Sequence, residues 1–150
     1  MEKQFVTKNR KAYHEFHILD KLEAGVELTG SEVKSLREGH ANLKEAYATI
    51  RGSELFLIGC HINPYSHTGY KGHEPLRDRK LLLHKNEILK IKQQLAEKGL
   101  TVIPLSIYFK DSWAKIEIGL AKGKKIHDKK AAIKERDIKR ETDREMSRYK

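Results

Sequence analysis

Apolar and charged residues alternate between positions 113 and 121, and this pattern constrains the fold of the chain more than any other feature. The sequence WAKIEIGLA places an apolar side chain at every second position from Ala114 to Leu120, with Lys115 and Glu117 between them. A period of two is that of a β-strand with one buried and one exposed face. The end of the sequence before its charged tail is therefore predicted to be a strand in a half-buried sheet.

Two pairs of strand-like runs are each separated by two residues, a spacing typical of a β-hairpin turn. Pro104 lacks a backbone N–H, so we expect the run that contains it to lie at a sheet edge or to carry a bulge. The predicted hairpins comprise residues 46–51 and 54–62 around Gly52-Ser53, and residues 100–110 and 113–121 around Asp111-Ser112.

The remaining parts of the first 80 residues are less regular. Residues 1–12 are polar and are expected to be loose. Residues 13–28 mix aromatic, β-branched and charged residues, which predicts a half-buried strand with a break at Gly25. Residues 61–80 contain two prolines and two glycines and are predicted to form a long loop.

Two helices are predicted. Thr29 followed three residues later by Glu32 is a capping-box pattern, and Gly39 ends a short helix over residues 29–38, with Val33 and Leu36 facing inward. A longer amphipathic helix is expected over residues 86–98. Its inward side chains are Ile88, Ile91 and Leu95, and Gly99 ends it.

Five or six strands with a short helix after the first and a longer one before the last pair predict a mostly β fold. The nearest architecture is an OB-fold-like antiparallel β-barrel with two to three helices and a basic C-terminal tail. We expect residues 1–123 to form the barrel and residues 124–150 to form the tail, a division that suits a single domain in a chain of 150 residues.

The charge lies mainly at the C-terminal end. Residues 122–150 hold 12 of the 31 Lys and Arg and 6 of the 21 Asp and Glu, and their few apolar residues form no helical stripe. Such runs are usually solvated tails. Here the basic run follows the last strand directly, which favours a functional tail. On a helix its like charges at i,i+4 would repel about as much as its opposite charges at i,i+3 attract, so we expect the tail to be disordered when free and helical against a polyanion.

An isoelectric point near 9.6 indicates a polyanionic partner, RNA or DNA before an anionic membrane. No run approaches 18 apolar residues, so no membrane partner is expected. The single cysteine, Cys60, excludes an internal disulfide and fits a reducing, cytoplasmic setting.

No motif in the sequence indicates catalysis, a cofactor or a metal. The eight histidines lack the Cys/His or HExxH spacings of metal sites, and Cys60 lies in a predicted strand, where a buried, inert thiol is expected. Glycine patterns for nucleotide binding are absent. The sequence therefore predicts a binding protein rather than an enzyme.

Binding of a folded RNA requires basic groups fixed on a rigid frame that matches the shape of the RNA. For Glu23 and Glu32 the plainer alternative to RNA binding is a role in capping, pairing or solubility. Arg77, Arg79 and Lys80 are interpreted as ordinary loop charge. The candidates for the fixed set are Asn9, Arg10, Lys11, Lys34 and Arg37.

Several segments together resemble the small protein B family, the SsrA-binding proteins that partner transfer-messenger RNA (tmRNA) in bacterial ribosome rescue. They follow one another over about 120 residues, which is more specific than one short pattern. The segments are NRKAYHEFHILDKLEAGVELTGSEVKSLREG (9–39), RDRKLLLHKNEI (77–88), GLTVIPLSIYFK (99–110) and IGLAKGKKIHDKK (118–130).

The resemblance implies an OB-fold-type barrel that binds the tRNA-like domain of tmRNA, and a tail placed in the empty messenger channel of a stalled ribosome. The implied partners are tmRNA, the small ribosomal subunit with its 16S rRNA, and, indirectly through the RNA, elongation factor Tu and alanyl-tRNA synthetase. The rival interpretation is a general, chaperone-like RNA-binding protein of the same fold without selectivity for tmRNA.

The resemblance also assigns residues. Leu82 matches a position that matters in the family, and we expect it to lie in the core. Lys130 stands where the family often has Arg, and Lys cannot make a bidentate or stacked guanidinium contact. The residues implied for tmRNA binding are Asn9, Glu23, Glu32, Lys34, Ser35, Arg37, Lys122, Lys124 and Lys125. Those implied for the decoding centre and the messenger channel are His127, Asp128, Lys129, Lys130, Lys134, Arg136, Ile138, Arg140 and Met146.

Overall fold

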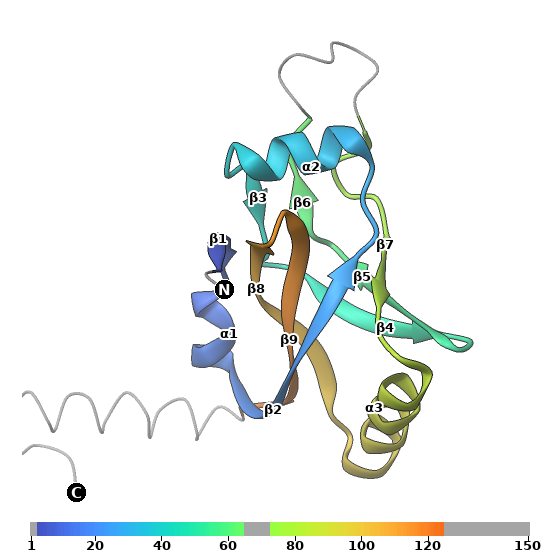
Figure 1. Cartoon of the computed structure of the whole chain (residues 1–150). Helices are drawn as coiled ribbons and strands as arrows, with labels where there is room; N and C mark the ends of the chain where they lie inside the picture. Colours follow the sequence, from blue (N-terminus) through green and yellow to red (C-terminus); the bar gives the residue numbers. More distant parts are fainter. Residues whose placement is uncertain (1–2, 65–72, 125–150) are drawn as a thin grey trace, which may run out of the picture.

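The computed structural model describes residues 3–64 and 73–124 (Figure 1). The tail and its predicted helix lie outside the described residues. The helices of the described part are α1 (Arg10–Glu15), α2 (Gly30–Arg37) and α3 (Lys85–Lys98). Its strands are β1 (Gln4–Lys8), β2 (Phe16–Val26), β3 (Ala41–Asn42), β4 (Tyr47–Arg51), β5 (Glu54–Ile58), β6 (His61–Ile62), β7 (Arg79–Leu82), β8 (Thr101–Lys110) and β9 (Trp113–Gly123).

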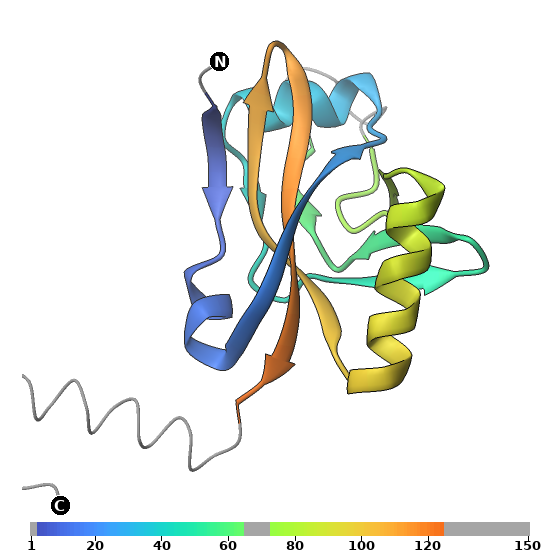
Figure 2. The ribbon, with the colours of Figure 1, turned by 60° about the horizontal axis from the view of Figure 1, so that its bottom comes forward.

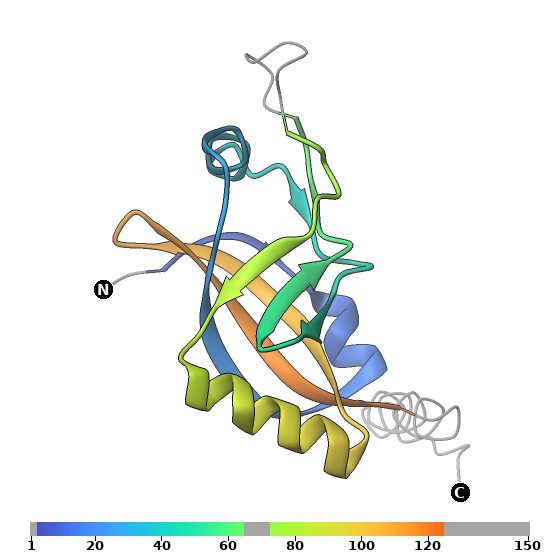
Figure 3. The same ribbon diagram turned by 90° about the vertical axis from the view of Figure 1, so that its right-hand side faces the viewer.

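All strand pairings in the described part are antiparallel, and the main sheet has the order β1-β8-β4-β5-β7-β2-β9. Because β8 also pairs with β9, the sheet curls into a ring, with β1 added on the outside (Figures 2 and 3). Helices α2 and α3 lie at opposite ends of this ring (Figure 1). The predicted mostly antiparallel β fold with two to three helices is confirmed.

Both predicted hairpins are present. Arg51 pairs with Glu54 across the first turn, and Lys110 pairs with Trp113 across the second. The register of β8 shifts just after Pro104, so the proline lies at a bulge, as one of the two expected alternatives requires.

The interior of the ring is built by the predicted alternation. Ile116, Ile118 and Leu120 on β9 are at most 2% exposed, while Lys115 and Glu117 point to the other face. Strand β8 is buried along most of its length because β1 and α1 cover its outer face. A second, small apolar cluster forms there from Ala12, Ile103, Leu105 and Ala121.

The two predicted helices are also confirmed. Thr29 and Glu32 form the capping box of α2, and Gly39 follows the helix with a φ of 80°. Helix α3 ends at Gly99, and Ile91 on its inner side is buried. None of the helices in the described residues is both long and apolar enough to cross a membrane.

Three predictions for the irregular segments are wrong. Within the segment 1–12, the described residues 3–12 are not loose, because β1 pairs with β8 and α1 follows it. Strand β2 continues through Gly25, where the side chain of Leu82 lies so close that a Cβ would be 3.3 Å from it. The predicted loop 61–80 contains β6 and the start of β7, and with β1, β3 and β6 the strands exceed the expected five or six.

Cys60 lies between β5 and β6 rather than inside a strand. Its side chain is fully buried, and burial raises the pKa of the thiol to about 11. A thiolate is the reactive form of cysteine, so this shift makes Cys60 inert, as expected.

The turn of the second hairpin is strained, which gives a prediction. Asp111 and Ser112 have positive φ values of 51° and 70°, a conformation that costs L residues energy and glycine little. We expect Ser112→Gly to raise the free energy of unfolding by up to about 1 kcal/mol, measured by urea denaturation. The control is Ser53→Gly in the other hairpin, where only Gly52 has a positive φ. An equal gain at both turns would contradict this explanation.

Candidate nucleic-acid interface

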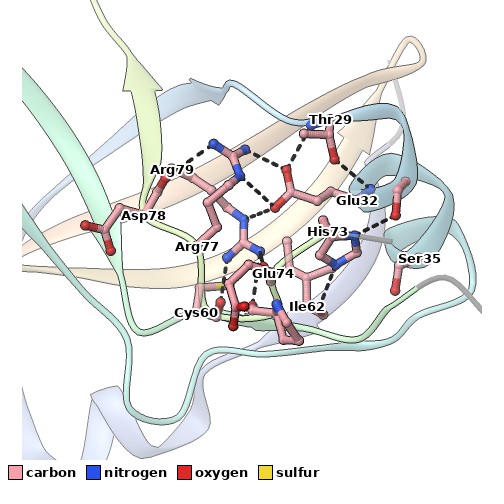
Figure 4. Close-up of polar contacts among 12 residues, drawn as sticks. Thr29, Glu32, Ser35, Cys60, Ile62, His73, Glu74, Arg77, Asp78 and Arg79 are labelled. Atoms are coloured by element: carbon pink, nitrogen blue, oxygen red, sulfur yellow. Dashed lines mark hydrogen bonds and ion pairs between the residues drawn. The ribbon is translucent and has the colours of Figure 1, made fainter. Parts of the chain in front are cut away.

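A buried carboxylate holds α2 against β7 (Figure 4). The side chain of Glu32 is completely buried, and its two oxygens accept hydrogen bonds from the guanidinium groups of Arg77 and Arg79. Arg79 is itself fully buried and also donates to the carbonyl of Cys60 at 2.6 Å. Two residues interpreted as ordinary loop charge are therefore the partners of a predicted RNA-binding residue.

The environment of Glu32 favours its charged form. Burial raises the pKa of the carboxyl, but hydrogen bonds from Arg77, the Thr29 N–H and Arg79 outweigh it, so the pKa lies below its usual range. Glu32 also completes the capping box by accepting from the N–H of Thr29 at 2.8 Å. The geometry gives Glu32 a structural role in capping and pairing, the plainer of the two alternatives.

Ser35 is turned inward in the same way. It is fully buried, and its hydroxyl donates to the carbonyl of Asn63 at 2.6 Å. Nearby, the ring of His73 bonds to the Ser31 hydroxyl and to the carbonyl of Ile62. These bonds fasten β6 and the segment before β7 to α2, so Ser35 positions this corner of the fold.

The basic residues of α2 face outward. Lys34 and Arg37 are both exposed, and the Arg37 guanidinium lies 4.6 Å from the centroid of the Phe109 ring. Cation–π contact restricts the motion of an arginine while leaving its N–H groups in water. Of the four α2 residues assigned to RNA, these two present charge at the surface.

Asn9 connects three segments. It is only 7% exposed, and its side-chain oxygen accepts from the Ala12 N–H at 3.2 Å as the N-cap of α1. Its amide nitrogen donates to the carbonyls of Pro104 at 2.9 Å and Leu43 at 3.3 Å. Asn9 therefore fixes α1 on β8. Any contribution of Asn9 to RNA binding is indirect and comes from this placement of α1.

The two basic residues after Asn9 differ in their surroundings. Arg10 is exposed. The ammonium of Lys11 lies 3.6 Å from Glu15 and 3.4 Å from Glu45, so neighbouring carboxylates of the chain balance much of its charge.

Glu23 lies on the outer face of β2, where its carboxylate accepts a hydrogen bond from the hydroxyl of Tyr108 and lies 3.8 Å from the ammonium of Lys110. The bond from Tyr108 lowers the pKa of Glu23, against a smaller opposing effect of burial. A partly exposed, oriented carboxylate results, and a groove of about 450 Å³ next to it is also lined by Gly25, Leu82 and Lys115.

Leu82 is 47% exposed in this groove, so the expectation that it lies in the core is wrong. Its side chain crosses Gly25 on the neighbouring strand instead of pointing inward. Lys115 and Trp113 are not among the predicted RNA-binding residues. Trp113 is 71% exposed and, together with Leu82, lines an adjoining groove of about 580 Å³. The alternation in β9 predicts that Lys115 points outward. Its proximity to Leu82 depends on strand pairing, because Gly25 on β2 pairs with both residues.

The start of the tail is attached to α1. Lys124 donates its backbone N–H to the carbonyl of Glu15 at 2.9 Å, and its ammonium reaches the carbonyl of Tyr13 at 3.4 Å. Lys122 is exposed near the end of β9. Lys125 and the predicted tail residues His127, Asp128, Lys129, Lys130, Lys134, Arg136, Ile138, Arg140 and Met146 lie outside the described residues.

In the part of the chain that the structure describes, no group of three His, Cys, Asp or Glu side chains is arranged to hold a metal ion. Around the Glu23 groove the surface instead combines the Glu23 carboxylate, the Lys115 ammonium and the exposed side chains of Leu82 and Trp113. This mixture of charge, acceptors and apolar surface is what recognition of a folded RNA uses.

Comparison with known proteins identifies the family. The model of the SmpB protein family matches residues 6–148. The chain belongs to the SmpB family. An SsrA-binding protein from Anaeromyxobacter sp. is 54% identical over 145 residues, covering 97% of this chain and 88% of the relative. One from Carboxydothermus hydrogenoformans is 51% identical over 150 residues, covering 99% of this chain and 100% of the relative.

The fold agrees with the family assignment. A solved structure described as "tmRNA-SmpB: a journey to the center of the bacterial ribosome" matches this SmpB-family chain with a TM-score of 0.70 and 43% identity. The match covers 85% of this chain and 93% of that chain. The resemblance drawn from the sequence segments is therefore confirmed.

The Glu32 site gives a prediction for stability. Glu32→Gln keeps the shape of the side chain but leaves the buried Arg79 without a counter-charge, which should lower the free energy of unfolding by about 3–5 kcal/mol. Glu54→Gln is the matched control, since its partner Lys80 also lies on β7 but the pair is exposed, and about 1 kcal/mol or less should be lost. Urea denaturation followed by circular dichroism measures both. Similar losses would contradict the special role of Glu32.

The same site predicts a pH dependence. Because the pKa of Glu32 is lowered on folding, its contribution to stability is present above the ordinary value of 4.5 and is lost as the pH falls further. The difference in stability between wild type and Glu32→Gln should therefore shrink below that pH. A constant difference down to strongly acidic pH would show that ionisation of Glu32 is not its cause.

Proposed function

We propose that the chain is an RNA-binding factor of trans-translation. It binds the tRNA-like domain of tmRNA, helps to deliver it to the A site of stalled ribosomes, and places its tail in the empty messenger channel. The observation that carries this proposal is the extent of the family match, which includes both the ring-shaped sheet and most of the basic tail at residues 6–148. The matched relatives are SsrA-binding proteins.

The ring-shaped unit, residues 1–123, holds the RNA. In the groove beside Glu23, Lys115 supplies a cation for a phosphate and Leu82 an apolar surface for a ribose or base. The Glu23 carboxylate accepts hydrogen bonds from 2′-hydroxyls or base amino groups. Its orientation by Tyr108 supports this role, because a fixed acceptor discriminates among RNA shapes better than a freely moving one.

The α2 surface adds charge to this interface through Lys34 and Arg37. Asn9, Glu32 and Ser35 contribute to RNA binding indirectly, since each is buried and fixes a segment that carries exposed groups. Arg10, Lys122 and Lys124 contribute further cations where α1 meets the start of the tail, and Lys125, outside the described residues, adds another.

The tail, residues 124–150, acts in the messenger channel of the small subunit against 16S rRNA. The basic stretch from Lys122 to the end of the tail suits a channel walled by phosphates, since each neutralised phosphate releases counterions. Elongation factor Tu and alanyl-tRNA synthetase meet this protein through the RNA, and the chain itself carries out no reaction. Such a factor works in the cytoplasm, where ribosomes translate.

The rival function, general RNA binding by charge alone, is less favoured. Counterion release gives little preference among RNAs. A surface built for it would not place an oriented carboxylate and exposed Leu82 and Trp113 side by side in adjoining grooves.

The α2 surface gives a prediction for RNA binding. Replacing Lys34 and Arg37 together by Ala should lower affinity for the tRNA-like domain and reduce the slope of log K against log salt by about two units. Stability should change by less than about 1 kcal/mol, because neither side chain is in the core. The control replaces Lys92 and Lys98 on α3, which removes the same charge elsewhere. An unchanged slope for the α2 variant would assign these residues to solubility alone.

The separate roles of the ring-shaped unit and the tail give a further prediction. A chain that ends at Lys124 keeps every described element and the bonds of Lys124 to α1, so it should fold with little loss of stability. After recovery from cells, sequencing should find one dominant RNA with tRNA-like ends bound to both the full and the shortened chain. Only the full chain should support tagging on stalled ribosomes.

Two outcomes would contradict the proposal. A broad mixture of RNAs on the full chain would favour the rival function. Loss of selective binding by a folded, shortened chain would show that the ring-shaped unit and the tail do not have separate roles.

A further inference from the structure

Two aromatic side chains that no predicted role uses are exposed in one groove. Phe5 on β1 is 50% exposed and Tyr13 on α1 is 48% exposed. Both line a groove of about 230 Å³, to which Lys8 and Arg10 contribute charge and Leu105 an apolar wall. Exposed aromatic rings usually stay isolated, so two in one basic groove require an explanation.

Lysines already cover both rings. The ammonium of Lys8 lies 4.3 Å from the centroid of Phe5, and that of Lys21 lies 5.4 Å from the centroid of Tyr13. Cation–π contacts at exposed sites are weak, so a ligand ring can replace an ammonium there at little cost. The displaced ammonium would remain close enough to pair with an anion on the same ligand.

The Phe5 ring packs against a second aromatic ring, that of Tyr108. Its centroid lies 5.6 Å from that of Tyr108, with 59° between the ring planes. Tyr108 is buried, its hydroxyl is bonded to Glu23, and the ammonium of Lys3 lies 4.7 Å from its ring centroid. Phe5 is thus a supported platform rather than a free side chain.

We propose that this groove binds one unpaired nucleobase of the RNA, stacked on Phe5 and in contact with Tyr13, with its phosphate near Lys8 and Arg10. The proposal rests on the proposed function, because the base belongs to the RNA that the chain holds. Aromatic rings interleaved with basic side chains are the usual means of binding single-stranded RNA, since every base has a π-face.

The size and charge of the groove favour a base over a peptide or a larger ligand. A volume of about 230 Å³ is below the range of pockets for drug-sized molecules and suits one planar ring system. Among the described residues of its lining, Glu117 is acidic and Lys8 and Arg10 are basic, which favours an anionic ligand.

The position of the groove allows one RNA to reach it and the Glu23 groove together. Phe5 pairs with Tyr108, and Tyr108 pairs with Lys115, so the three residues lie side by side across β1, β8 and β9. Directly opposite residues on neighbouring strands are about 5 Å apart. Phe5 is therefore about 10 Å from the residue that contributes a cation to the Glu23 groove.

The test measures affinity for a transcript of the tRNA-like domain at three salt concentrations. Phe5→Leu should weaken binding by about 5- to 150-fold, which is the usual effect of removing one stacking ring. The salt slope should not change, because no phosphate contact is lost. Phe5→Trp should restore affinity, and Lys8→Gln should instead reduce the slope by about one unit.

Leu89→Ala is the control for loss of exposed apolar surface, since Leu89 on α3 is 56% exposed and lines neither groove. It should leave binding unchanged. Thermal unfolding checks each variant, and if Phe5→Leu does not fold, Tyr13→Leu on the surface of α1 decides the question.

Equal affinity of folded Phe5→Leu and wild type at every salt concentration would overturn the proposal. So would equal weakening by Phe5→Leu and Phe5→Trp. In either case selective binding by the wild-type chain would leave the proposed function standing. If the wild-type chain itself showed no selectivity for the tRNA-like domain, the proposed function would be rejected, whatever the groove variants did.

Discussion

The arrangement of the surface depends on one buried charge group, Glu32 between Arg77 and Arg79. Removing ions from water costs several kcal/mol each, so such a group is stable only when its partners meet it in one geometry. An apolar contact of equal size could hold α2 on the ring as firmly but would allow it to slide. The ion pairs fix both the position and the rotation of α2, and with them the direction in which Lys34 and Arg37 point.

The outer face of the sheet follows the same principle of fixed polar groups. Tyr108 stands between two grooves, because its hydroxyl orients Glu23 and its ring supports Phe5. The inner face of these strands is a continuous apolar core that includes Ile116 and Ile118. A close-packed interior resists small shifts, so the outward residues of β2, β8 and β9 keep their relative positions. Shape selectivity for RNA requires this rigidity more than it requires charge.

Features set by local sequence could be predicted, whereas features set by distant partners could not. The capping box of α2 and both hairpin turns involve residues at most three apart, and all are present. Strand β1 was missed because its polar sequence becomes a strand only beside β8, about 100 residues later. The arginine partners of Glu32 could not be predicted for the same reason, since they lie 45 and 47 residues away. The exposure of Leu82 could not be predicted, because nothing in its apolar run indicates that its side chain lies over Gly25 on the neighbouring strand.

The distribution of charge explains why a shaped interface and a basic tail belong to one chain. Residues 1–121 hold 19 basic and 15 acidic side chains, while residues 122–150 hold 12 and 6. With so small an excess, the ring-shaped unit cannot rely on counterion release alone and must derive its selectivity from fitted contacts. The tail has the opposite character, with strong attraction to any polyanion and little means of discrimination. Joined through Lys124, the selective contact raises the effective concentration of the unselective one at a single place, so the tail needs no specificity of its own.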